Sequence, residues 1–265
     1  MATWVIVGCG FTGQELARQL VAGGHDVIVT RRDAGRAEAI AGELGPHARG
    51  LALDLAGPLP ALPTGAIVAC LAPPGADPAG EITRLATACE RVIYVSSTGV
   101  YGAGHGAWVD EGWPLAPLTR EGAARVLAER ALPGAAIALR AAGIHGPGRG
   151  LVDRLRAGTY RIVGDGGAHV SRIHVADLAQ AIARAGERPD VTGAVNVADD
   201  APDPIGLVAD TLADRLGVAR PARIDPASAS PELAGMLLAD RRISNARLKR
   251  ELGVVLRYPS WRDLA

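Results

Sequence analysis

The feature that most constrains this chain is the segment Gly8-Cys9-Gly10-Phe11-Thr12-Gly13, which directly follows the apolar run Trp4–Val7 and opens a stretch with helical spacing. In this context one glycine makes a tight turn, one lets backbone approach a diphosphate, and one packs the helix against the strand. Free N–H groups at the start of the helix attract the diphosphate. The segment therefore predicts a dinucleotide-binding loop, with a purely structural turn as the alternative. The expected cofactor contacts are Gly8, Gly10, Phe11, Thr12 and Gly13.

Apolar runs alternate with helical stretches through the first half of the chain. The expected strands are Trp4–Val7, Val27–Thr30, Leu51–Leu53, Ala66–Leu71, Val92–Ser96 and Ala136–Leu139. The expected helices are Gln14–Ala22, Ala34–Leu44, Glu81–Glu90 and Arg120–Leu132. Strands that are apolar on both faces and alternate with helices indicate a parallel sheet covered on both sides. We therefore predict an α/β fold with a Rossmann-type, doubly wound parallel sheet.

The pattern loosens after Arg140, where glycine and proline are frequent. We expect helices at Leu151–Ala157, Val175–Ala185, Ile205–Leu216 and Ser244–Leu252, and a late strand at Ala194–Val197. The organisation predicted is a dinucleotide-binding domain at 1–142 and a small C-terminal substrate lobe at 143–265, interleaved with late sheet elements near 172–200. This lobe is expected to close over the carboxyl ends of the strands.

The end of the second strand bears on the choice of cofactor. Arg31 falls about where NAD-binding chains place an acid for the ribose hydroxyls, and a guanidinium pairs with a 2′-phosphate. Arg31 and Arg32 therefore favour NADP over NAD, although Asp33 leaves NAD open. Asp54 is expected to accept from the adenine amino group, with a helix cap as the alternative. Leu71, at the end of the fourth strand, is a further expected cofactor contact.

Composition excludes several classes of function. Lys+Arg and Asp+Glu both number 28, so nothing in the net charge indicates a nucleic acid or an anionic membrane as partner. No apolar run approaches the ~20 residues that span a bilayer. The 3 cysteines are scattered, are expected to be buried, and form no metal-ligand pattern. We expect a cytoplasmic protein with a small-molecule substrate and no metal.

The chain resembles the extended short-chain dehydrogenase/reductase family, in its epimerase/dehydratase-like branch. The marks, which cover nearly the whole chain, are Gly8–Gly13, Val95–Gly102, Arg140–Pro147, Ile173–Leu178, and Leu252-Gly253 with Tyr258-Pro259. The resemblance implies that Ser97 hydrogen-bonds the substrate and that Thr98 and Tyr101 lie on the substrate side. A homodimer is left open by the same resemblance.

The family's Tyr-x-x-x-Lys pair is absent. Lys249 is the only lysine, and Asn245 stands four residues before it. Alignment on Glu129 places Glu121 at the tyrosine position and Arg125 at the lysine position. Glu121 is then a candidate acid/base and Arg125 a candidate contact to the nicotinamide ribose. The alternative is that Glu121 and Arg125 form a surface ion pair at i,i+4. If the alignment shifts by one residue, Arg120 becomes a candidate as well.

Further departures narrow the substrate. Thr98-Gly99 stands where family dehydratases carry Asp-Glu, and the arginine that grips a substrate diphosphate would align at Val170. A nucleotide sugar is therefore disfavoured. His145 is a candidate for proton transfer, with a packed loop histidine as the alternative. Arg149 and Arg172 are candidates for an anionic substrate group.

These features lead to one main hypothesis and two alternatives. The main hypothesis is an NAD(P)-dependent oxidoreductase or epimerase that acts on a small hydroxyl or carbonyl substrate with a non-standard acid/base. The first alternative is a catalytically degenerate NADP-binding sensor or regulatory protein. The second is a domain that binds another nucleotide cofactor, such as a flavin.

Overall fold

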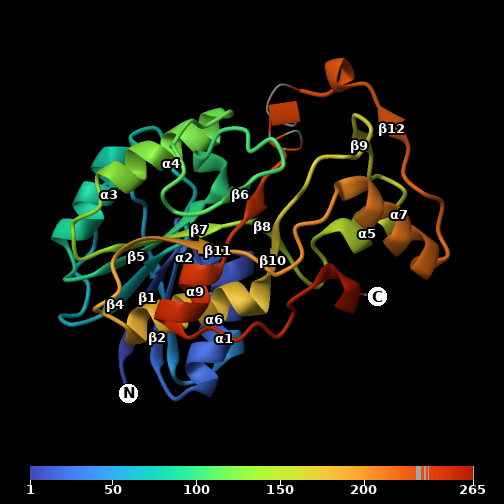
Figure 1. Cartoon of the computed structure of the whole chain (residues 1–265). Coiled ribbons are helices and arrows are strands. Elements are labelled where there is room, and N and C mark those ends of the chain that lie inside the picture. The colour runs from blue at the N-terminus through green and yellow to red at the C-terminus, as the bar shows by residue number, and fades with distance from the viewer. Residues whose placement is uncertain (231–233, 236, 238, 265) are drawn as a thin grey trace.

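Seven parallel strands form the main sheet, which lies between helices in the larger part of the molecule (Figure 1). The structure is a computed structural model that describes residues 1–230, 234, 235, 237 and 239–264. The strands are β1 (Thr3–Val7), β2 (Asp26–Arg31), β3 (Ala48–Ala52), β4 (Ile67–Cys70), β5 (Val92–Ser97), β7 (Ile137–Ala141) and β11 (Gly193–Val197). Their order is β11-β7-β5-β4-β1-β2-β3. The predicted doubly wound parallel sheet is confirmed.

Strand side chains alternate between two cores. In β1, Trp4 and Ile6 join the core beneath one layer of helices, while Val5 and Val7 join the core beneath the other. The first layer holds α1 (Phe11–Ala22), α2 (Ala34–Leu44), α6 (Val175–Glu187) and α9 (Ala246–Leu252). The second holds α3 (Pro78–Thr87) and α4 (Arg120–Arg130). Because successive side chains of a strand point to opposite faces and both faces are covered by helices, the strands are apolar throughout.

The strand order reverses next to β1, which pairs with β2 on one side and with β4 on the other. The chain runs outward from β1 to β3 and then crosses back to β4. In open α/β sheets a ligand binds at the carboxyl ends of the strands where this reversal occurs. The Gly8–Gly13 segment follows β1 at this point.

A separate apolar core holds the lobe together. It gathers α5 (Leu151–Arg156), β9 (Ile162–Val163), α7 (Ile205–Leu216) and the short helix η3 (Trp261–Asp263) around Tyr160 and Trp261. β9 pairs with β12 (Arg223–Ile224), and β11 returns to the main sheet beside β7. Figure 1 shows these lobe elements to one side of the sheet. Late residues therefore contribute both to a small lobe and to the sheet edge.

Two further pairs of short strands lie at the carboxyl side of the sheet. β8 (Gly143–His145) pairs with β10 (Arg172–His174), and β6 (Trp108–Val109) pairs with β13 (Arg242–Ile243). The remaining short elements are the turns of 3-10 helix η1 (Thr98–Val100) and η2 (Pro226–Ser228). Within the described ranges, no helix is both long enough and apolar enough to cross a membrane.

Candidate cofactor and substrate site

The predicted phosphate loop joins β1 to α1, and its glycines are required by close packing. Gly8 has a φ of +81°, and a Cβ there would lie 2.8 Å from the backbone of Ala72, just after β4. A Cβ on Gly13 would lie 3.2 Å from Ile6 and 3.3 Å from the Cys9 sulfur. Gly10 caps α1 without a side-chain hydrogen bond, and the first turn has no acidic residue. The positive end of α1 is therefore open to an anion.

Arg31 stands beside this loop at the end of β2. Its Nη1 lies 3.9 Å from the position that a Cβ on Gly10 would occupy. Its Nε is buried and has no hydrogen-bond partner among the described residues. A buried donor without a partner is costly, so its environment fits an anionic group of a ligand. Arg32, the next residue, is exposed.

The nearby acids are used by the protein itself. Asp33 caps α2 by accepting from the Arg36 N–H at 2.8 Å. Asp54 is exposed and accepts from the Ala56 N–H at 3.1 Å. Leu71 donates its N–H to Val7 at 2.8 Å, which places it beside the phosphate loop. Asp33, the acid that left NAD as an alternative cofactor in the sequence analysis, therefore caps its own helix.

Ser97 ends β5, at the carboxyl edge of the sheet. Its Oγ accepts from the Gly99 N–H at 3.0 Å, which leaves its own O–H able to donate. Thr98 follows in η1 and is partly exposed. Helix α4 packs tightly on this turn, because a Cβ on Gly122 would lie 2.3 Å from the Gly99 oxygen. Glu121, the residue before Gly122, is exposed in the first turn of α4.

Arg125 reaches from α4 to β5. Its Nη1 donates to the Val95 oxygen at 2.7 Å and lies 3.3 Å from the Tyr94 hydroxyl. Burial raises the pKa of Tyr94 to about 12, so this phenol is a poor proton donor. The positions expected for the tyrosine and lysine of the family are thus filled by an exposed carboxylate and by a guanidinium held to the strand.

Tyr101 lies in a buried polar network rather than at the surface. Its hydroxyl donates to the Asn196 Oδ1 and accepts from the Arg140 Nη1, both at 2.8 Å. Arg140 forms a buried ion pair with Glu129 at 2.7 Å, and the Ser96 hydroxyl also donates to Glu129. Tyr101 is fully buried. Its hydroxyl, which was predicted to contact substrate, is therefore hydrogen-bonded to two groups of the protein itself.

The sequence did not point to this network, because Asn196 lies 95 residues from Tyr101 and carries no motif. Glu111 lies in a loop where the family resemblance implies a substrate-side acid, with a solvated turn as the alternative; in the structure its Oε1 accepts from the Asn196 N–H at 2.8 Å.

His145 is brought to His174 by the register of β8 and β10, and their rings meet edge to face at 5.2 Å. Burial, then His174 and Arg172, lower the pKa of His145 to about 4. His174 accepts from the Ala176 N–H at 3.2 Å and stacks on Tyr258 at 3.6 Å. A buried imidazole that is neutral at pH 7 is poorly suited to donate a proton there.

Arg172 is buried near the lobe. Its Nη1 donates to the Val170 oxygen at 3.0 Å, whereas its Nη2 is buried without a partner among the described residues. Burial raises the pKa of the neighbouring Asp199 to about 7. Arg149 is exposed instead, and its guanidinium lies 5.3 Å from the Phe11 ring centre in the phosphate loop. Arg149 and Arg172, the two arginines predicted to bind substrate, are thus in different environments.

Thr12, a predicted cofactor contact in the phosphate loop, is mostly buried.

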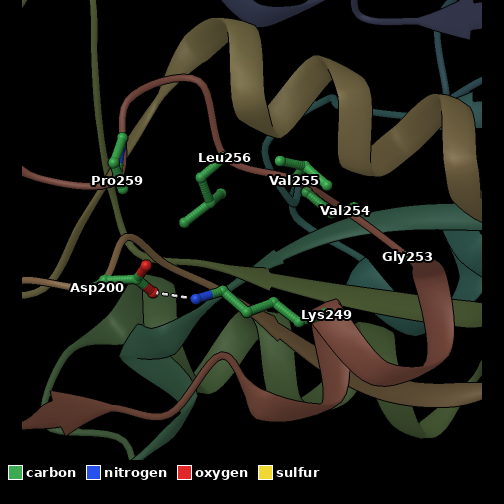
Figure 2. Close-up of a pocket in the computed structure, with 7 residues that line it drawn as sticks. All are labelled: Asp200, Lys249, Gly253, Val254, Val255, Leu256 and Pro259. Atoms are coloured by element: carbon green, nitrogen blue, oxygen red, sulfur yellow. Dashed lines mark hydrogen bonds and ion pairs between the residues drawn. The ribbon is translucent and has the colours of Figure 1, made fainter.

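A cavity of about 430 Å³ lies elsewhere, between α9 and the segment after it. Figure 2 shows Asp200 and Lys249 joined by an ion pair of 2.5 Å at this cavity, opposite Leu256 and Pro259. None of its lining residues was predicted to be functional. In the part of the chain that the structure describes, no group of three or more His, Cys, Asp or Glu side chains is arranged to hold a metal ion.

Comparison with known proteins agrees with the position of the loop. A family model described as NADP oxidoreductase coenzyme F420-dependent matches residues 3–57. A curated protein, the 3-diazoavenalumate denitrifying reductase of a Streptomyces species, is 32% identical over 165 residues. That match spans 58% of this chain and 53% of the reductase, so it covers about half of the relative's length.

Solved structures match over almost the whole chain. A functionally unknown conserved protein from Silicibacter pomeroyi is 35% identical, with a TM-score of 0.84, over 99% of this chain and 96% of that chain. A protein described as an NAD-dependent epimerase/dehydratase from Methylobacillus flagellatus is 28% identical, with a TM-score of 0.74, over 98% and 94%. The human epimerase family protein SDR39U1 (isoform 2), solved with NADPH, is 20% identical, with a TM-score of 0.77, over 98% and 96%; this last likeness shows the fold alone.

Proposed function

We propose that this chain, which shares its fold with a structure described as an NAD-dependent epimerase/dehydratase, binds NADP and reduces a small substrate with a carbonyl or similarly electrophilic group. The observation that carries the proposal is Arg31, whose guanidinium stands beside the phosphate loop while Asp33 is engaged in capping α2. A guanidinium at this position pairs with a 2′-phosphate. The human relative was solved with NADPH, and the Streptomyces relative is named a reductase, which support the same proposal.

The residues around Ser97 would direct the chemistry. When bound, NADPH would supply the hydride for this reduction. The Ser97 hydroxyl, whose Oγ already accepts from Gly99, donates a hydrogen bond to the substrate oxygen and orients it. Glu121 would hold the proton that the substrate oxygen receives, directly or through water. Thr98, the next residue in the chain, would lie on the substrate side.

Arg125 would hold the nicotinamide ribose while it stays hydrogen-bonded to Val95. As an arginine it cannot be a neutral amine at usable pH, so it positions but does not exchange protons. Gly8, Gly10, Phe11, Thr12 and Gly13 would surround the diphosphate, with Arg32, Asp54 and Leu71 on the adenosine and strand side.

Fluorescence titration of the full chain with NADPH and NADH tests cofactor binding, and NADPH consumption with a panel of small aldehydes, ketones and quinones tests the reduction. We expect saturable NADPH binding and oxidation that is stoichiometric with a reduced product. Absence of NADPH binding would contradict the proposal. Turnover without net oxidation of the cofactor would indicate epimerisation instead.

A binding protein without chemistry is the second candidate. It is favoured by one observation, the loss of the family's tyrosine and lysine together with the hydrogen bonding of Arg125 to β5. Tight NADPH binding with no oxidation across the panel would support this candidate over the reductase.

A further inference from the structure

Arg149 ends a tight turn between β8 and α5. Gly146 and Arg149 exchange two backbone hydrogen bonds, of 2.8 and 3.0 Å, and Gly148 at the corner has a φ of +73°. Such a turn fixes the backbone from which the Arg149 side chain leaves, so the guanidinium starts from a defined position although it is exposed.

This turn packs directly on the phosphate loop. A Cβ on Gly146 would lie 3.2 Å from the tip of the Phe11 ring and 2.6 Å from Val175. The close approach brings the Arg149 guanidinium to 5.3 Å from the Phe11 ring centre, within the range of a cation–π contact. Phe11 lies in the phosphate loop and is the first residue of α1.

The charge of Arg149 is not neutralised locally. No acidic side chain among the described residues forms an ion pair with it, and the first turn of α1 has no acid. Arg31 stands beside Gly10 on the β2 side of the loop, and Arg149 lies over Phe11 on the β8 side. Two arginines from distant parts of the chain therefore flank one loop, and both guanidinium groups are suited to phosphate oxygens.

We propose that Arg149 binds the diphosphate of the cofactor, in place of the anionic substrate group expected from the sequence. The inference rests on the proposed function, because it presupposes that the loop holds NADP. Arg149 lies two residues before α5, so the contact would also tie the lobe to the bound cofactor. The two arginines would then have separate tasks: Arg31 would distinguish NADP from NAD, and Arg149 would bind both.

Equilibrium titration of the full chain separates these tasks. Arg149→Ala is expected to weaken NADPH and NADH alike, by about tenfold or more, because each loses one charge-assisted hydrogen bond. Adenosine 2′-monophosphate has no diphosphate. Its dissociation constant, measured by displacement of NADPH, should therefore be the same for the variant and for the parent. Arg149→Lys, which keeps the charge but not the planar group, should be intermediate. Arg156→Ala removes an exposed arginine from α5 and is the matched control.

A second readout follows the lobe. NADPH should increase hydrogen-exchange protection across residues 146–156 in the parent protein but not in Arg149→Ala. Unchanged affinity of Arg149→Ala for both cofactors would overturn the inference, as would a loss confined to NADPH, which would place Arg149 at the 2′-phosphate. Failure of the parent protein to bind either cofactor would instead defeat the proposed function.

Discussion

Two polar regions at the carboxyl side of the sheet differ in how their charges are satisfied. Around the phosphate loop, Arg31 has a buried Nε without a partner and Arg149 has no ion pair among the described residues. In the network behind β5, β7 and β11, Arg140 donates to the Tyr101 hydroxyl and forms an ion pair with Glu129. Polar groups that the protein satisfies itself stabilise the fold, whereas those left open are available to a ligand. The two regions should therefore respond differently to mutation.

The largest effect is expected in the satisfied network. Glu129→Ala would leave the Arg140 guanidinium buried without its carboxylate, and breaking a buried pair costs about 3–5 kcal/mol. Urea denaturation should show this loss in the free energy of unfolding. Glu187→Ala is the control, because it breaks an exposed Arg184–Glu187 pair and should have little effect. Equal losses in the two variants would remove the distinction.

The pH dependence of stability tests the buried groups near the lobe. Burial lowers the pKa of His145 to about 4, so the folded state binds fewer protons than the unfolded state between about pH 4 and 6.5. The contribution of His145 to the free energy of unfolding is therefore lost as the pH falls through this range. Burial raises the pKa of Asp199 to about 7, so its contribution is lost as pH rises through the same window. The shifts correspond to about 3 kcal/mol for His145 and about 4 kcal/mol for Asp199.

His145→Asn should therefore make the free energy of unfolding fall more steeply with rising pH between about 4 and 7, and Asp199→Asn should make it rise. Urea denaturation at several pH values measures both slopes. If both variants changed the slope in the same direction, the account of these two environments would be wrong.

At the substrate side, Ser97→Ala should lower turnover on the order of a hundredfold, because the substrate oxygen loses its donor. The dissociation constant for NADPH should stay unchanged, since Ser97 is assigned to substrate. Steady-state kinetics with a substrate found in the panel gives the first value and fluorescence titration the second. Ser228→Ala changes an exposed serine and serves as the control; equal activity of both variants would exclude Ser97 from the reaction.

A smaller effect is expected for Glu121→Gln, about tenfold or more in turnover, because water can partly replace an exposed acid/base. Steady-state kinetics with the same substrate measures this loss. Full activity would remove Glu121 from the mechanism and leave the proton to water alone.

Elements that depend on local signals could be predicted from the sequence. Helix α2 was predicted with its observed bounds, because Asp33 caps it and Gly45 follows it. β3 was expected at Leu51–Leu53 but runs over Ala48–Ala52. In this position β3 packs closely on α2, since a Cβ on Gly50 would lie 2.4 Å from the Glu38 nitrogen. That contact leaves no trace in the hydrophobic pattern.

Elements that depend on distant partners could not be predicted. β6 consists of Trp108 and Val109, and it exists because residues 242 and 243 pair with it. The same reason hid the environment of Tyr101, whose hydroxyl is bound by Asn196 and Arg140. Motifs in the phosphate loop, by contrast, are local and carry their function in their spacing.

The contrast between open and satisfied charges is tested most directly by calorimetric titration of the parent protein and Arg31→Ala with NADPH and NADH. The parent should bind NADPH tenfold to a hundredfold more tightly than NADH, an estimate of about 1.5–3 kcal/mol for one arginine–phosphate contact. Arg31→Ala should lose this preference and keep its NADH affinity. A parent protein that prefers NADH, or a preference for NADPH that survives in Arg31→Ala, would contradict the account.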